Sequence, residues 1–136
     1  MQALPARRLK VDHHCGGLCD LVEQGAGALL IGSDTFFTHA TRDQIISLAA
    51  RYAVPALFVE SAAVAAGALS SYGPNLPHEF QQVGLYTGSI FNGEKLADLP
   101  VVQPTQFELM INLKTAKALG LTIPTAILIQ ADEVLE

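Results

Sequence analysis

Between residues 26 and 67, short apolar runs alternate with a segment of helical periodicity. AGALLIG and PALFVE are apolar runs bounded by glycine or proline, as expected for strands that are covered on both faces. Between them, THATRDQIISLAARY carries its apolar residues on one helical stripe, and Thr41 and Gln44 have the spacing of a capping box. Pro55 ends this helix, and the small residues of SAAVAAG predict a second, short helix after the second strand.

The second half of the chain continues the pattern with longer elements. ALSSYG predicts a third, weaker strand, and Asn75 and Pro77 begin a helix over residues 76–91. Its apolar residues recur every three or four positions, and Asn92-Gly93 ends it. FELMIN then predicts a strand, LKTAKALG a helix between Asn112 and Gly120, and Pro124 the start of a terminal helix.

Strands that alternate with helices predict an α/β fold. We expect a three-layer α/β/α arrangement with a mostly parallel sheet and right-handed crossovers. The length of 136 residues suits one domain, with residues 18–136 as a single α/β domain and residues 1–17 as an unassigned amino-terminal segment.

Composition and charge exclude several classes of protein. Half of the residues are apolar and the net charge of −5 comes from scattered acids, so the clustered Lys and Arg of a nucleic-acid surface are absent. The apolar stretches fall short of the roughly 20 residues that span a bilayer. MQALPARRLKVDHHCGGLCD lacks the apolar segment of an export signal, so the chain as written is expected to be cytoplasmic.

The segment HHCGGLC is the one candidate for metal binding, because Cys15, Cys19, His13 and His14 are zinc-ligand types. Structural zinc sites place their second ligand pair well downstream, whereas these four residues lie within seven positions. We therefore favour a simple lead-in to a helix and expect no metal. We also expect no cofactor, since IGSD offers one glycine where a dinucleotide-binding fingerprint needs three.

Polar and aromatic side chains follow each of the three predicted parallel strands. Because the carboxyl ends of parallel strands share one edge of the sheet, these side chains are expected to form a ligand-binding crevice there. Structural roles remain open for single residues: Asp34 can cap a turn, Ser61 can cap its helix, and Phe36 or Phe37 can be core. The candidate ligand-binding residues are Ser33, Asp34, Thr35, Phe36, Phe37, Glu60, Ser61, Tyr72 and Gly73.

Five stretches carry a specific resemblance: GSDTFF, TRDQIISLAARYAVPA, SYGPNL, the block NGEKLADLPVVQPTQFELMINLKTAKALGLTIP, and ADEVLE. In this order, over residues 18–136, the chain resembles the carboxy-terminal lobe of the substrate-binding proteins of ABC transporters, the family with a type I periplasmic-binding-protein fold. The resemblance implies a solute such as an amino acid held between two α/β lobes, an ABC permease as partner, and a periplasmic location if an export signal lies upstream.

The sequence departs from that family in length, because the signal peptide and nearly all of the amino-terminal lobe have no counterpart. A single wall should bind a solute weakly. The helix of residues 76–91 and the FELMIN strand would expose apolar surface meant for the other lobe, so we expect a homo-oligomer.

No pattern of nucleophile, base and orienting partner indicates an enzyme, and neither G-x-S-x-G nor P-loop spacing occurs. The alternative to solute binding is a truncated remnant that folds as an oligomer and has no physiological ligand.

Overall fold

The fold was analysed in a computed structural model, which describes residues 24–136. The candidate metal ligands between His13 and Cys19, and the unassigned segment 1–17, lie outside the described residues. Within residues 24–136, every helix is too short or too polar to span a lipid bilayer.

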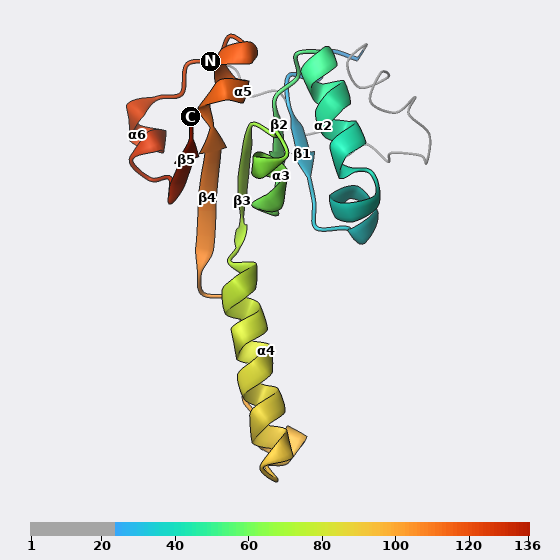
Figure 1. The fold of residues 1–136 in the computed structure, drawn as a ribbon, viewed down its shortest axis with the longest axis vertical. Helices are drawn as coiled ribbons and strands as arrows, with labels where there is room; N and C mark the ends of the chain where they lie inside the picture. Colours follow the sequence, from blue (N-terminus) through green and yellow to red (C-terminus); the bar gives the residue numbers. More distant parts are fainter. Residues whose placement is uncertain (1–23) are drawn as a thin grey trace.

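A five-stranded sheet forms the centre of the fold, and its strands lie side by side in their order along the chain (Figure 1). Three of the four strand pairs are parallel, and the pair β3–β4 is antiparallel. This confirms the predicted α/β class and the mostly parallel sheet. The strands are β1 (Leu29–Ile31), β2 (Ala56–Phe58), β3 (Ser70–Pro74), β4 (Phe107–Asn112) and β5 (Glu133–Leu135).

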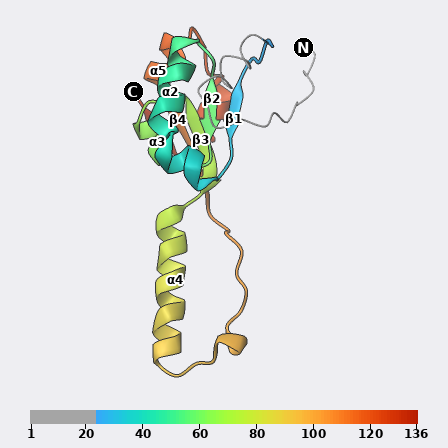
Figure 2. The ribbon, with the colours of Figure 1, turned by 90° about the vertical axis from the view of Figure 1, so that its right-hand side faces the viewer.

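Two helices, α2 (Arg42–Arg51) and α3 (Ala62–Ala65), cover one face of the sheet (Figures 1 and 2). The core lies between them and the strands, where Ile46 of α2 and Ala63 of α3 pack with Phe58, which is completely buried. Phe58 is flanked in register by Ile31 of β1 and Ser71 of β3, so the core face of each strand is set by alternation along the strand.

The helix α2 starts after Thr41, as predicted, but the predicted capping box is wrong. The Thr41 side chain caps no amide of α2 and instead donates its hydroxyl to the carbonyl oxygen of Phe36, at 3.0 Å. The reason is a π-helical turn over Phe36–Ala40, which the sequence pattern did not indicate and which ends directly at Thr41.

The carboxy-terminal helices begin where the sequence predicts, but the last strand, β5 (Glu133–Leu135), was not predicted. The helix α5 (Leu113–Ala118) begins at Asn112, whose side chain accepts from the amide of Thr115, and Gly120 follows in a left-handed conformation (φ 69°). The terminal helix α6 (Thr125–Leu128) is a single turn. The predicted pattern missed β5, which follows it and pairs with β4.

Residues 75–106, here called the arm, project away from the sheet (Figure 2). They comprise α4 (Leu76–Phe91), a 3-10 turn over Leu96–Asp98 and an extended return segment that runs beside α4. The Tyr86 hydroxyl donates to the carbonyl oxygen of Pro100, at 2.8 Å, and ties helix and return segment together. No residue of α4 is buried. This helix therefore has the predicted limits but no core of its own.

The expectation that FELMIN exposes apolar surface meant for another lobe is wrong for most of this strand. Met110, Ile111 and Asn112 are buried, because β4 lies between β3 and β5. Its first residue, Phe107, is the exception and is 49% exposed. Among the described residues, exposed large hydrophobic side chains are most numerous in the arm, and others, such as Leu30 in β1 and Ile129 after α6, lie elsewhere.

Gly73 has a structural role, because β3 passes very close to the end of β2 there. A Cβ atom at Gly73 would collide with the carbonyl oxygen of Val59 and lie 2.7 Å from its Cγ1. We expect Gly73→Ala to destabilise the protein by roughly 1–3 kcal/mol, because the two strands would have to separate. Chemical denaturation followed by circular dichroism measures this change.

The matched control is Gly84→Ala in α4, where a Cβ atom would meet no other atom within 4 Å. It should leave stability unchanged or raise it by less than about 1 kcal/mol. Equal effects of the two substitutions would contradict the close approach at Gly73.

Candidate functional site

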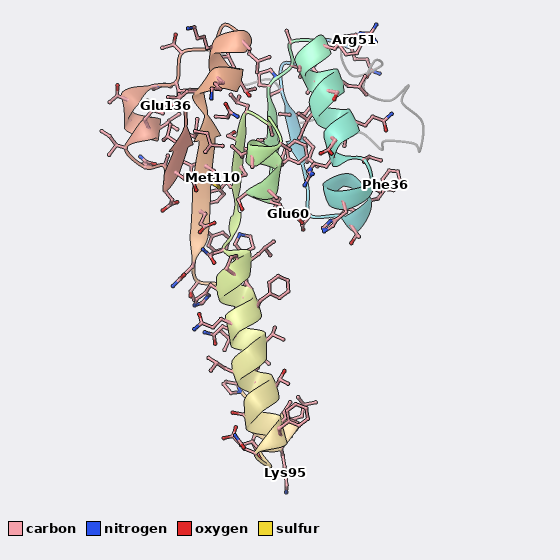
Figure 3. All side chains as sticks on the ribbon, viewed as in Figure 1. Phe36, Arg51, Glu60, Lys95, Met110 and Glu136 are labelled. Atoms are coloured by element: carbon pink, nitrogen blue, oxygen red, sulfur yellow. The ribbon has the colours of Figure 1, made fainter. Side chains whose placement is uncertain are left out.

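The carboxyl ends of β1, β2 and β3 lie side by side at one edge of the sheet. Both strand pairs are parallel, with Leu30 opposite Leu57 and Phe58 opposite Ser71. In Figure 3, Phe36 and Glu60 mark this edge, whereas Arg51 lies at the opposite edge. The structure thus brings the three predicted loops together, and the arm begins at the same edge.

The loop after β1 is exposed, and a hydrogen bond within the loop holds its turn. Ser33, Asp34, Thr35 and Phe36 are all exposed. The Asp34 side chain accepts from the amide of Phe36, with Oδ1 2.8 Å from the nitrogen. The structural role weighed for Asp34, a turn cap, is therefore present. The Phe36 side chain is 40% exposed and is not core, and the side chain of Phe37 lies outside what the structure describes.

The loop after β2 carries Glu60 and Ser61, both half-buried. Ser61 stands at the start of α3, but its hydroxyl makes no capping hydrogen bond. The turn closes instead through main-chain bonds to the carbonyl oxygens of Glu60 and Ser61, from the amides of Ala63 and Val64. The helix-cap role weighed for Ser61 is therefore wrong, and the hydroxyl does not stabilise α3.

The third strand divides its two candidate residues between the faces of the sheet. Gly73 is buried against Val59, which leaves its main chain little room to touch a solute. Tyr72 points to the other face and is 55% exposed. Its ring stacks on that of Phe107, with centroids 5.8 Å apart and planes at 22°.

Sequence reasoning missed Phe107 and Glu108 at this edge, and it predicted Asn75 as the start of a helix rather than as a partner of Glu108. The Asn75 side chain caps α4 by accepting from the amide of His78, at 2.7 Å, and donates to the Glu108 carboxylate. The antiparallel pairing of β3 with β4 brings Phe107 and Glu108 here, since it places the start of β4 beside the end of β3. Phe107 and Glu108 could have been placed at this edge if FELMIN and ALSSYG had been predicted to pair as antiparallel strands.

The loops at this edge are acidic. Residues 32–37, 59–61 and 72–75 contain Asp34 and Glu60 and no Lys or Arg. Together with exposed aromatic rings, carboxylates suit recognition of an ammonium or another cationic group on a partly apolar molecule. Asp34, Phe36 and Tyr72 are exposed to solvent at this edge.

Comparison with known proteins gives an independent assignment. A sequence profile of the family described as ABC transporter substrate binding protein matches residues 19–135. No curated protein matches the chain. Among solved structures, a conserved domain protein from Vibrio cholerae superimposes with a TM-score of 0.81 at 24% identity, over 88% of this chain and 40% of that one.

Two further solved structures are similar. One is the ABC domain from Streptococcus pneumonia in complex with L-Trp, with a TM-score of 0.77 at 24% identity over 85% of this chain and 39% of that one. The other is a ligand-free, open substrate-binding protein with adhesive properties from Clostridium difficile, with a TM-score of 0.61 at 25% identity over 88% and 39%. The chain thus spans about two fifths of each of these proteins. From the profile match over residues 19–135, the chain belongs to the ABC transporter substrate-binding protein family.

Proposed function

We propose that this chain supplies one wall of a solute-binding site in an ABC-type transport system. The solute is a small organic molecule such as an amino acid, and it contacts the edge where β1, β2 and β3 end. The observation that carries this proposal is the meeting of three parallel strand ends with polar and aromatic side chains at one edge. Ligands of open α/β sheets bind outside the carboxyl ends of the strands.

The chemistry of the edge supports an amino acid. Asp34 and Glu60 supply negative charge for an ammonium group, and Ser61 supplies a hydroxyl that is not used to cap α3. Phe36 and Tyr72 supply apolar faces for a side chain. The complex of the pneumococcal protein with L-Trp supports the same class of solute, since that protein shares the fold.

The family to which the chain belongs indicates its transport partner. An ABC permease would receive the solute, and the substrate-binding role argues against catalysis. A periplasmic or extracytoplasmic site of action suits that role.

Of the sixteen large hydrophobic side chains exposed in residues 24–136, nine lie in the arm, which therefore suits packing against a second α/β lobe or a second copy.

Amino-acid binding is tested by amide-shift NMR titration of the 136-residue chain. We expect shifts confined to residues 33–37, 60–61 and 72–75 and to Phe107, which stacks on Tyr72. Dissociation constants should be about 1 mM or weaker, because the described residues supply a single wall. Asp34→Asn keeps an acceptor for the Phe36 amide but removes the charge. It should weaken binding about tenfold, as expected for loss of a hydrogen bond to a charged group.

Asp34→Ala is the companion variant, since it removes both the turn cap and the charge. If Asp34→Asn binds as well as the native protein and Asp34→Ala does not, the role of Asp34 is confined to the turn. Micromolar binding elsewhere on the chain, or no shift with any amino acid, would contradict the proposed site. The second outcome would favour the alternative of a protein without a solute.

Self-association through the arm is tested by sedimentation equilibrium at micromolar concentration. Phe80 and Val83 lie on one side of α4 and are 71% and 61% exposed. We expect at least a dimer, and Phe80→Glu should shift it to monomer because a charge would be buried in the contact. The control is Leu85→Glu, on the opposite side of the helix, which should leave the dimer intact. A native protein that is monomeric throughout would contradict this expectation.

A further inference from the structure

The stacked rings of Tyr72 and Phe107 are held in place by the sheet. In the β3–β4 register Pro74 lies opposite Phe107 and Tyr72 lies opposite Leu109, so the two rings are diagonal neighbours on one face. Their centroids are 5.8 Å apart, within the range of favourable aromatic pairs. Each ring is nevertheless about half exposed, at 55% and 49%.

The main chain under these rings has little freedom. Gly73 fits against Val59 without room for a Cβ atom, which fixes β3 beside the end of β2. The amide of Asn75 donates to the carbonyl oxygen of Gln106, at 3.0 Å, and closes the base of the arm. A pair of rings on a fixed backbone is preorganised, so a ligand that stacks on it has little ordering cost to overcome.

Polar groups occupy the same end of the sheet as the rings, although Glu108 lies on the opposite face of β4 from Phe107. The adjoining residue of β4, Glu108, is bonded to Asn75 on the other side of the strand, and Glu60 follows the neighbouring strand β2. An exposed aromatic pair at a strand end that also carries polar groups has the composition of a small-molecule site.

We propose that Tyr72 and Phe107 together form the face that takes the planar or apolar side chain of the solute, with Phe107 as the residue that positions the Tyr72 ring. This inference rests on the proposed function and narrows it. Without the Phe107 ring, Tyr72 would lose its stacking partner and rotate about its side-chain bonds. The site would then lose its preference for a planar group while its polar groups remained.

The test compares L-tryptophan, L-leucine and glycine as probes in NMR titrations of the native protein and of Phe107→Leu, Phe107→Tyr and Phe91→Leu. Phe107→Leu should weaken L-tryptophan binding about 3- to 10-fold, the range expected for loss of an aromatic pair, and change L-leucine binding less than about twofold. Phe107→Tyr keeps a ring and should restore the native affinity. Phe91→Leu makes the same change at a phenylalanine near the far end of α4, 86% exposed, and should alter neither.

The outcomes separate this inference from the function on which it rests. If the three loops shift with the probes but Phe107→Leu binds L-tryptophan as the native protein does, the inference is overturned and the proposed function stands. An equal loss for all three probes would assign Phe107 a structural role and also overturn the inference. If no probe shifts the loops of the native protein, the proposed function fails first and the inference fails with it.

Discussion

The antiparallel pairing of β3 with β4 is the constraint on which the other features depend. It reverses the direction of the sheet, so the end of one strand and the start of the other meet at the edge where β1 and β2 also end. The arm leaves and returns through these two strands, and the bond from the Asn75 amide to the Gln106 carbonyl oxygen closes its base. The same pairing brings Tyr72 against Phe107. Arm, edge and aromatic pair are thus fixed by one set of strand contacts.

Buried polar groups give this pairing its register. Asn112, at the end of β4, is 8% exposed, and its amide group donates to the carbonyl oxygen of Val64 in α3, at 3.3 Å. Thr115 donates its hydroxyl to the carbonyl oxygen of Gly67, at 3.0 Å, so α5 is attached to the turn after α3. A shift of β4 by one residue would break the hydrogen bond from Asn112 to Val64 and turn Met110 toward the other face, at a cost of several kcal/mol.

Local sequence signals predicted most elements, because their causes are local. The helix limits at Asn75 and Asn112 follow from side chains that accept from the amides three residues later, and both predictions are confirmed. β5 and the π-helical turn were missed, since three residues of strand and a non-standard turn carry little periodicity. At the edge, residues that follow a strand could be predicted, whereas Phe107 and Glu108 begin one. They reach the site only through the antiparallel pairing, which no local pattern specifies.

The exposure of α4 in the arm has a consequence for the edge of the sheet. A helix with no buried residue, such as α4, gains little from packing, so its 16 residues depend on capping at Asn75 and on intrinsic propensity. The exposed apolar residues of α4 would contribute to stability if a second body packed against them. If that body also lay over the edge, it would exclude water from Asp34, Glu60 and Tyr72. Stabilisation of the arm and burial of a molecule bound at the edge would then be coupled, since one surface would contribute to both.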